Sequence, residues 1–344
     1  MCAQPTIRFA AINLNHGHIF GQTNALLNAG AELVSFFAKE PELAAQYSAQ
    51  FPQARLGSSE QAILEDESID LIITAGIPAE RAPLGIAAMQ HGKDFMSDKP
   101  GFTTLDQLDE ARRVQAETGR IYSIDYSERF ENRATEKAAQ LVRGGAIGEV
   151  VNIIGTGPHL ARLETRPEWF FQRERYGGII CDIGSHQFDQ FLYFSQEKNV
   201  EVVASQVANY HHPDTPELED FGDVMLRGER CTGYIRVDWF TPDGLPTWGD
   251  GRLFVIGTEG YIEARKYVDI AGRPGPDHLF LVNGQEVQYV DCSGVELPYG
   301  KNLVYDIVNR TETAMTQEHC FHASELALTA EAVATRLGYL PDLE

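Results

Sequence analysis

The feature that most constrains this fold is a repeated alternation of short apolar segments and longer helical segments across residues 7–125. Apolar runs rich in β-branched residues, separated by helical periodicity, are typical of βαβ units on a parallel sheet. The segments with strand composition are 7–13, 32–37, 69–75, 94–97 and 120–124. The pattern predicts a Rossmann-type, doubly wound parallel sheet, which binds its ligands at the carboxyl ends of the strands.

After a predicted helix at 131–143 the pattern changes to closely spaced strands. Turns such as Val282-Asn283-Gly284-Gln285 are too short for anything except antiparallel pairing. The predicted strands are 149–156, 200–209, 223–227, 232–239, 252–256, 261–265, 278–282 and 286–290, and two helices, 303–315 and 323–337, close the chain. We therefore expect a parallel-sheet domain at 1–125 and an α+β domain with a large, mostly antiparallel sheet at 126–344.

Composition narrows the class of partner. A chain of 344 residues is long enough for two cores, and its formal net charge of −22 repels nucleic-acid phosphates and anionic lipid surfaces. The five cysteines are scattered and odd in number, as expected of reduced thiols. No apolar run approaches the roughly 20 residues that span a bilayer. We expect a cytoplasmic protein with neither a nucleic-acid nor a membrane partner.

The first strand-to-helix turn departs from the usual glycine pattern of a dinucleotide-binding turn. Glycines there let the backbone approach a pyrophosphate at a helix N-terminus. In this chain Asn13, Asn15 and His18 stand where glycines are expected, and His16 and Gly17 lie between them. Asparagine tolerates left-handed backbone better than most residues, so the turn can form. The segment by itself leaves a cofactor-binding turn and an ordinary turn both open.

The end of the second strand bears on the choice of cofactor. In an NAD-binding fold this strand usually ends in an acid that accepts hydrogen bonds from the adenosine ribose. Here the sequence runs Phe36-Phe37-Ala38-Lys39-Glu40, with no acid at the expected place. Lys39 would attract the 2′-phosphate of NADP, so NADP is as plausible as NAD. The alternative is that Lys39 is a solvated surface charge.

Lys99 follows the predicted strand at 94–97 and precedes Pro100. A proline disfavours helical backbone at the residue before it, which holds Lys99 at a defined turn. A positioned ammonium binds a substrate hydroxyl and stabilises the alkoxide that develops from it. Taken alone, Lys99 is better explained as a surface lysine before an ordinary loop proline.

Asp182 and His186 are four residues apart, which puts them on one face if 178–194 is helical. Asp189 and Tyr193 extend this face, and much of the remaining surface is apolar. Histidine titrates near pH ~6.5, so His186 suits the role of general base toward a substrate hydroxyl. Asp182 would anchor the substrate or tune the imidazole. A satisfied Asp–His pair in the core is the structural alternative.

A basic and aromatic stretch lies upstream, with His159, Arg162 and Trp169 as its candidates for substrate binding. Such a stretch binds a sugar ring or a carboxylate, or pairs with neighbouring residues such as Glu164 in a surface network; both readings stay open. The spacing of His16, His18, His159 and His186 matches no zinc pattern, so we predict no metal.

Two motifs together resemble the Gfo/Idh/MocA family of oxidoreductases, named for glucose-fructose oxidoreductase and inositol dehydrogenase. They are Asp98-Lys99-Pro100, where the family has Glu-Lys-Pro, and Gly177-Gly178 leading to Asp182-x-x-x-His186. The resemblance covers nearly the whole chain. It implies that Lys99 contacts substrate and nicotinamide ribose, that His186 is the acid/base, and that Asp182 orients substrate hydroxyls. It also implies an open-faced second sheet that commonly serves as an oligomer interface. Arg81 stands where many relatives carry a histidine.

These observations predict an NAD- or NADP-dependent dehydrogenase acting on a secondary alcohol of a sugar, cyclitol or sugar derivative, assembled as a homodimer or homotetramer. A ligand-binding or regulatory relative that kept the fold and lost hydride transfer is the alternative. The expected cofactor contacts are Asn13, Asn15, His16, Gly17, His18, Lys39, Gly76, Pro78 and Lys99. The expected catalytic residues are Lys99, Asp182 and His186, and the substrate contacts add His159, Arg162 and Trp169.

Overall fold

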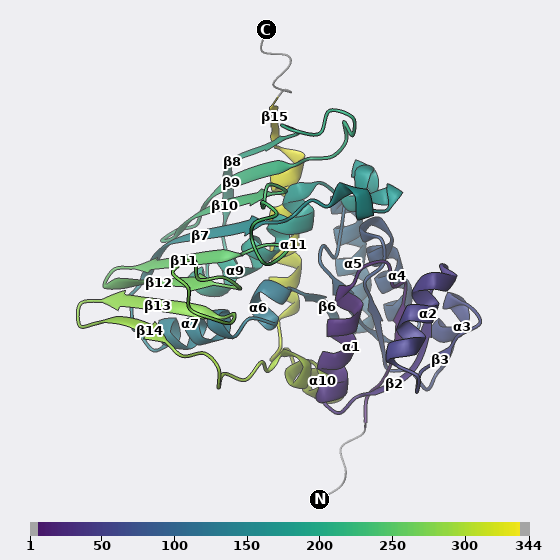
Figure 1. The fold of residues 1–344 in the computed structure, drawn as a ribbon. Coiled ribbons are helices and arrows are strands. Elements are labelled where there is room, and N and C mark those ends of the chain that lie inside the picture. Colours follow the sequence, from purple (N-terminus) through teal and green to yellow (C-terminus); the bar gives the residue numbers. More distant parts are fainter. Residues whose placement is uncertain (1–5, 338–344) are drawn as a thin grey trace, which may run out of the picture. The chain divides into compact units, whose positions relative to one another are not determined.

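A computed structural model describes residues 6–337 and divides them into two compact units (Figure 1). The first unit contains residues 6–125 and 298–322, and the second contains residues 126–297 and 323–337. The chain therefore leaves the first unit, builds most of the second, and returns to the first before it ends in the second.

The first unit is built on a six-stranded parallel sheet with the strand order β3-β2-β1-β4-β5-β6. This confirms the predicted Rossmann-type sheet, with helices in the connections between strands. Its elements are β1 (Arg8–Ile12), α1 (His18–Asn28), β2 (Glu32–Phe37), α2 (Pro41–Gln50), β3 (Arg55–Leu56), α3 (Glu60–Leu64), β4 (Leu71–Thr74), α4 (Pro78–Gln90), β5 (Asp94–Asp98), α5 (Leu105–Thr118) and β6 (Tyr122–Asp125).

Local sequence accounts for several boundaries in this unit. The side chain of Thr104 accepts a hydrogen bond from the Gln107 N–H at the start of α5, which ends at Gly119 in left-handed backbone. Helix α4 packs closely on the sheet because Gly85 has no side chain: a Cβ there would lie 2.6 Å from the rings of Phe95 and Tyr122. Apart from Arg8 at the start of β1 and Thr74 at the end of β4, these core strands are apolar, as parallel strands covered on both faces are.

The returning segment packs on the first unit through α10 (Tyr299–Asn309). The backbone of α10 touches α1 at Gly300, where a Cβ would lie 2.6 Å from the Ala25 carbonyl oxygen. Past the end of α10, Arg310 makes a bidentate ion pair with the buried carboxylate of Asp94, at 2.6 and 2.8 Å. We expected all of 126–344 to lie in the second domain, whereas residues 298–322 belong to the first unit. Periodicity predicts a helix in this segment, but it does not show which sheet that helix packs on.

The second unit is built on a nine-stranded sheet with the order β14-β13-β12-β11-β7-β10-β9-β8-β15. The pairs β7–β10 and β8–β15 are parallel and the others are antiparallel, which confirms the expected mostly antiparallel sheet. Its strands are β7 (Val150–Pro158), β8 (Glu201–Ala208), β9 (Phe221–Arg227), β10 (Thr232–Asp238), β11 (Arg252–Gly257), β12 (Gly260–Arg265), β13 (His278–Asn283), β14 (Val287–Val290) and β15 (Thr335–Leu337).

Helices cover one face of this sheet: α9 packs on β7 and β10, and α7 packs on β12 and β13. The helical elements of the unit are α6 (Ser127–Phe130), α7 (Arg133–Arg143), η1 (Leu163–Thr165), η2 (Glu168–Phe171), α8 (Arg173–Tyr176), η3 (Ile180–Gly184) and α9 (Ser185–Ser195). Helix α11 (Gln317–Ala332) begins in the first unit and continues into the second.

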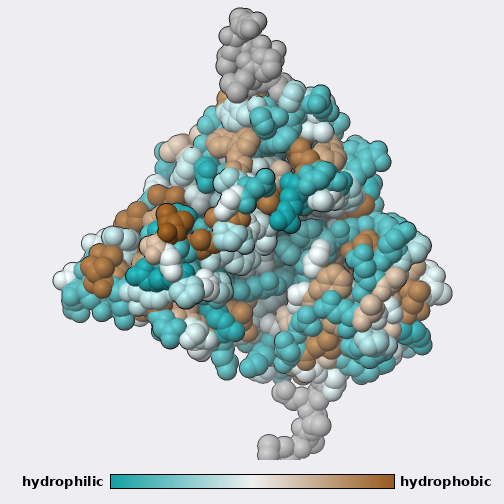
Figure 2. Space-filling view, in the orientation of Figure 1, coloured by the Kyte–Doolittle hydropathy of each residue, from teal (hydrophilic) through white to brown (hydrophobic). Residues whose placement is uncertain are grey.

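The other face of the nine-stranded sheet carries partly exposed side chains. Along β9 and β12 burial alternates with a period of two, and Met225 and Tyr261 remain about half exposed. Figure 2 shows hydrophobic side chains on the surface over β11 to β13. This is the open face that the resemblance implied. The oligomer expected there stays a prediction.

The end of the described chain differs from the expected helix at 323–337. Helix α11 starts at Gln317 and ends at Ala332, and Thr335–Leu337 form the edge strand β15, in parallel register with β8. The free edge of β8 decides this conformation, which residues 335–337 do not encode by themselves. Within residues 6–337, no helix combines the length and the apolar character needed to cross a bilayer.

The contact between α10 and α1 yields a prediction about stability. Substituting Gly300→Ala should lower the free energy of unfolding by about 1–3 kcal/mol, because the new methyl group collides with backbone that cannot move aside. Gly284→Ala is the matched control, since nothing lies within 4 Å of a Cβ at that position. Chemical denaturation of both variants measures the difference. Equal stabilities would mean that the segment 298–322 does not rest on this contact.

Candidate functional site

The carboxyl ends of β1, β4 and β5 bring the expected cofactor residues of the first unit together. Asn13 has φ 59°, so it supplies the left-handed backbone that a glycine would otherwise provide. The Asn13 N–H donates to the Phe37 carbonyl at 2.9 Å, and the His16 N–H donates to the Ala75 carbonyl at 2.8 Å. Gly76 completes the close packing, because a Cβ there would lie 2.8 Å from the Asn13 Cβ. The turn therefore forms without the usual glycines.

Asp98, the last residue of β5, is the centre of a hydrogen-bond network that the sequence did not reveal. Its carboxylate lies 2.8 Å from His18 Nδ1, 3.2 Å from His16 Nδ1 and 3.1 Å from Arg81 Nη2. Burial acts to raise the pKa of Asp98, but His18 and Arg81, followed by the hydrogen bonds from both histidines, lower that pKa well below its usual range. The carboxylate is held ionised.

The pKa of His16 is also lowered, but for a histidine this favours the neutral form. Burial and then the nearby His18 lower the pKa of His16 to about 4, although hydrogen bonding and attraction to Asp98 act against the shift. A third of the His16 side chain stays exposed to solvent. His16 therefore stays neutral near pH 7. The two rings meet edge to face, with centroids 4.2 Å apart.

His16, His18 and Asp98 each place one possible ligand atom within 4.8 Å of the others, a spacing that suits a metal ion. The surrounding charges disfavour this use. The guanidinium of Arg81 is bonded to the same carboxylate, and the Lys99 charge contributes to the low pKa of His16. A divalent cation would join two positive side chains around a single carboxylate. The cluster is better described as a hydrogen-bond network that holds the turn.

Arg81, in α4, connects three parts of the carboxyl edge. Its guanidinium donates to the Gly76 carbonyl at 2.7 Å, to the Pro100 carbonyl at 3.1 Å, to the Lys99 carbonyl, and to Asp98. The side chain is 2 % exposed. Pro78 begins α4, and the Lys99–Pro100 peptide bond is cis. Arg81 thus holds the backbone of Lys99 and Pro100 and the side chain of Asp98, which explains the residue that stood out as a departure from the family.

The end of β2 differs from the expected picture of the adenosine site. The Lys39 ammonium lies 3.2 Å from a Glu80 carboxylate oxygen, in an exposed ion pair. An acid does lie next to the turn: Glu40 accepts a hydrogen bond from Asn15 Nδ2 at 2.9 Å. The sequence signal was an acid three residues after the strand end rather than at it. Lys39 as a partner of the 2′-phosphate stays a prediction.

In the second unit, Asp182 and His186 lie where a short π-helical turn, η3, passes into α9. Asp182 is half-buried and falls in the π-turn, and His186 is buried in the first turn of α9, 6.2 Å from the Tyr126 ring between centroids. Single π-turns inside α-helices are rare and occur frequently at functional sites. The Gly177-Gly178 pair before it has φ of 92° and 94°, a conformation that favours glycine.

The part of the polar face of α9 that follows His186 forms a buried ion pair instead of a candidate substrate contact. Asp189 is fully buried and forms a bidentate ion pair with Arg129, at 2.6 and 2.7 Å. The Arg129 guanidinium also lies 4.5 Å from the centre of the Tyr193 ring. The face that the sequence extended to Asp189 and Tyr193 is therefore used by a buried ion pair one turn beyond His186.

The basic and aromatic stretch forms a ring cluster. His159 lies 4.4 Å from Trp248 and 5.4 Å from Trp239 between ring centroids, and Trp169 lies in η2, half-buried. Arg162 is exposed, in left-handed backbone. Arg166, another cation of this stretch, lies over Trp239 at 5.1 Å. Burial lowers the pKa of Arg166, and the charge of Asp182 opposes that shift. Arg166 and Asp182 are thus close enough for their charges to interact.

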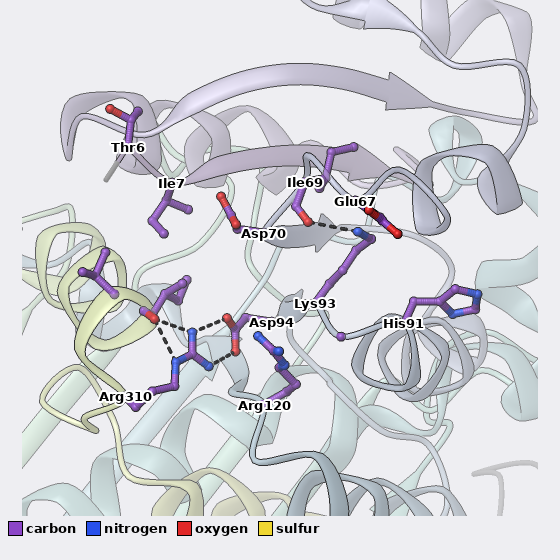
Figure 3. A pocket seen from close by; sticks show the side chains of 13 residues that line it. Thr6, Ile7, Glu67, Ile69, Asp70, His91, Lys93, Asp94, Arg120 and Arg310 are labelled. Atoms are coloured by element: carbon purple, nitrogen blue, oxygen red, sulfur yellow. Dashed lines mark hydrogen bonds and ion pairs between the residues drawn. The ribbon is translucent and has the colours of Figure 1, made fainter. Parts of the chain in front are cut away.

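The first unit also has a polar cavity of about 440 Å³ at the amino edge of its sheet, lined by the starts of β1, β4 and β5 (Figure 3). Its charged groups are largely paired. Arg310 binds Asp94, and the Lys93 ammonium donates to the carbonyls of Asp66 and Ile69. This edge lies opposite the carboxyl ends of the strands, so the cavity is separate from the expected cofactor site.

The Arg81 network yields a second prediction. Arg81→Ala should lower the free energy of unfolding by about 3–5 kcal/mol, because it leaves the Asp98 carboxylate buried without its guanidinium partner. Arg113→Ala removes an exposed arginine that pairs with Glu110 and Glu117 within α5, and should leave stability close to that of wild type, because exposed ion pairs contribute little. Thermal and denaturant unfolding compare the two. Similar losses in both variants would contradict the central role of Arg81.

Comparison with known proteins agrees with this architecture. Residues 14–126 match the oxidoreductase family with an NAD-binding Rossmann fold, and residues 135–263 match the GFO/IDH/MocA C-terminal domain. The crystal structure of a protein assigned as an oxidoreductase in Erwinia carotovora atroseptica is 47% identical, with a TM-score of 0.94 over 97% of this chain and 100% of that one.

Curated relatives are more distant. The scyllo-inositol 2-dehydrogenase (NAD(+)) of Bacillus subtilis is 27% identical over 58% of this chain and 56% of its own. The 1,5-anhydro-D-fructose reductase of Ensifer adhaerens is 26% identical over 70% of both chains. The chain spans about half the length of the first curated relatives that it matches. The two matched regions together cover most of this sequence, and the chain belongs to the GFO/IDH/MocA family of oxidoreductases.

Proposed function

We propose that this protein is a nicotinamide-dinucleotide-dependent dehydrogenase that acts on a secondary alcohol of a sugar, cyclitol or sugar derivative. The observation that carries the proposal is the placement of Lys99. Arg81 and Asp98 hold it directly after β5, on the carboxyl edge where a Rossmann-type sheet binds its ligand. Family membership supports the same reading, and relatives with named activities act on inositols and sugars.

The turn between β1 and α1 fits a dinucleotide. Asn13 takes the left-handed conformation, helix α1 begins at His18, and the space beside Gly17 is open, with nothing within 4 Å of a Cβ there. A helix N-terminus after such a turn suits a pyrophosphate. When bound, the dinucleotide supplies a two-electron acceptor for the carbinol hydrogen. Asn15, His16 and Gly76 are the further residues of this edge that we assign to its binding.

The roles of the catalytic residues follow from their chemistry. His186 accepts the proton of the substrate hydroxyl while the carbinol carbon is oxidised. The Lys99 ammonium, on the carboxyl edge of the first unit, stabilises the negative charge that develops on a substrate oxygen. Asp182 accepts a hydrogen bond from a neighbouring hydroxyl and so orients the ring. The rings of His159 and Trp169, together with Arg162, supply further contacts to a polyhydroxyl substrate.

We propose that NAD is preferred to NADP. The Glu40 carboxylate, bonded to Asn15 of the turn, can accept hydrogen bonds from ribose hydroxyls and repels a 2′-phosphate. Lys39, the residue that would attract this phosphate, is paired with Glu80. Both observations favour NAD, which lacks the 2′-phosphate and therefore carries the smaller negative charge.

His18 favours a second candidate function, that of a ligand-binding or regulatory protein. Its side chain occupies a position that is usually glycine and bonds to Asp98, so the turn presents imidazoles as well as backbone amides. A ligand-binding or regulatory relative would tolerate this change more easily than a dehydrogenase. Such a protein would bind a dinucleotide or a sugar without turnover.

The cofactor proposal predicts a specific binding pattern in calorimetry. The wild type should bind NADH more tightly than NADPH, and Glu40→Ala should weaken NADH about tenfold or more, because hydrogen bonds to a charged acceptor are lost. Lys39→Ala should leave NADH affinity unchanged. A wild-type preference for NADPH that disappears in Lys39→Ala would assign Lys39 to the 2′-phosphate instead.

The catalytic proposal predicts that His186→Ala lowers kcat by about 10²–10⁴ while NADH binding stays intact. Lys99→Ala should have a similar effect, because it removes the positive charge that stabilises the developing alkoxide. The exposed His91→Ala is the matched control.

The substrate panel for this assay includes scyllo-inositol, D-xylose and levoglucosan, after which relatives are named. Wild-type activity that survives in both single variants would exclude the mechanism. Dinucleotide or sugar binding with no turnover across the panel would favour the regulatory alternative.

A further inference from the structure

A cluster of charged side chains lies at the start of the helix that carries Asp182 and His186. Two carboxylates reach backbone N–H groups there: Glu219 accepts from Ile179 at 2.9 Å, and Glu331 accepts from Ile180 at 3.1 Å. Both carboxylates are nearly fully buried. The first N–H groups of a helix have no partner within the helix, so acceptors at this position determine how the first turn is held.

Gly178 makes the approach of Glu331 possible. Its φ is 94°, and a Cβ at this position would collide with the Glu331 carboxylate. The carbonyl of Gly178 also accepts from the Asp182 N–H at 2.8 Å. The glycine therefore combines the left-handed turn with the space that the carboxylate needs, directly beside the turn that contains Asp182.

Arg173 connects the two carboxylates. It donates to Glu331 at 2.7 Å and to Glu219 at 3.1 Å, and Arg336 of β15 donates to Glu219 at 2.7 Å. Glu331 comes from α11 and Arg173 from α8. The helix start is thus anchored to distant elements by charge-assisted hydrogen bonds, the stronger class of hydrogen bond in proteins.

We propose that Glu331 is a positioning residue: its carboxylate, admitted by Gly178, holds the Ile180 N–H and so sets the place of the η3 turn and of Asp182 and His186. The proposal rests on the proposed function, in which these two residues act on the substrate. Nothing in the Asp182-x-x-x-His186 motif contains this anchor, because Glu331 lies 151 residues from Ile180 along the chain.

The charge state of this cluster changes near neutral pH. Burial and then the Glu219 carboxylate raise the pKa of Glu331 to about 7, against the attraction of Arg173. Burial also raises the pKa values of Cys181 and Tyr176, the other titratable groups facing the cluster, well above neutrality, with the two glutamates contributing. Among the groups of this cluster whose pKa is shifted, Glu331 is the one whose pKa lies close to 7.

This shift has a defined sign in the pH dependence of stability. The folded protein keeps a proton on Glu331 at pH values where the unfolded chain, with an ordinary carboxyl pKa, has lost it. The contribution of Glu331 to the free energy of unfolding therefore falls as pH rises from the ordinary carboxyl range to about 7, and it stays low above that. Glu331→Gln, which does not titrate, should lack this decline.

Three substitutions of Glu331 separate the effect of side-chain length from the effect of charge. Glu331→Gln keeps an oxygen that can accept from Ile180, Glu331→Asp keeps the charge but is one methylene shorter, and Glu331→Ala removes both. Displacement of a catalytic group by about 1 Å costs on the order of 10² in rate. We expect kcat to fall about 10- to 100-fold in Glu331→Asp and Glu331→Ala, and to stay within about threefold of wild type in Glu331→Gln. NADH affinity should not change.

Glu174→Gln is the matched control, because it removes an exposed carboxylate from the neighbouring helix α8. It should keep the wild-type kcat and the wild-type dependence of stability on pH. The stability of Glu331→Gln should rise relative to that of wild type as pH increases from the ordinary carboxyl range to about 7, because the variant lacks the contribution of Glu331. A stability difference between Glu331→Gln and wild type that does not change with pH would overturn the assignment of the titration.

Amide hydrogen exchange tests the anchor without any assay of activity. Glu331→Asp and Glu331→Ala should exchange faster in residues 179–186 and unchanged in the strands of the first unit. Exchange that stays at the wild-type rate overturns the proposal, and so does faster exchange with an unchanged kcat. If the wild type turns over no alcohol in the panel, the proposed function fails, and exchange alone then decides whether Glu331 anchors this helix.

Discussion

The buried contact between Arg81 and Asp98 is the interaction on which the arrangement of the first unit's carboxyl edge depends. Neither side chain is more than 2 % exposed, so each would be costly to bury without the other. The guanidinium has more donors than one carboxylate can use, and the remaining donors bind carbonyls of Gly76, Lys99 and Pro100. One cation thereby connects the ends of β4 and β5 and holds the backbone around Lys99.

In the second unit, buried charged side chains also bind the backbone, but there they are carboxylates that accept from N–H groups. There two buried carboxylates hold backbone N–H groups at the start of a helix, and Arg173 balances their charge. In both units a glycine provides the space: Gly76 beside Asn13, and Gly178 beside Glu331. Candidate functional side chains are placed in each case by buried ionic groups that bind the backbone, which is a more rigid support than packing of the side chains themselves.

The sequence correctly predicted those elements and motifs that depend on residues close together in the chain. Strand β2 was predicted with the observed bounds, and Lys99 was expected directly after a strand of the parallel sheet. The pair Asp182 and His186 was placed on one helical segment, although the π-turn between them was not foreseen. These successes depend on periodicity, proline and glycine, which act over a few residues.

What the sequence by itself determined is the alternation that produces a parallel sheet followed by a mostly antiparallel one, together with the identity of the residues available for chemistry. Only the tertiary structure decided which distant side chains support them. Arg81 stood out only as a departure from the family, Glu40 was given no role, and Glu331 was one acid among 50 acidic residues. Their roles depend on partners brought together by folding, and single-residue patterns carry no record of contacts between segments far apart in the chain.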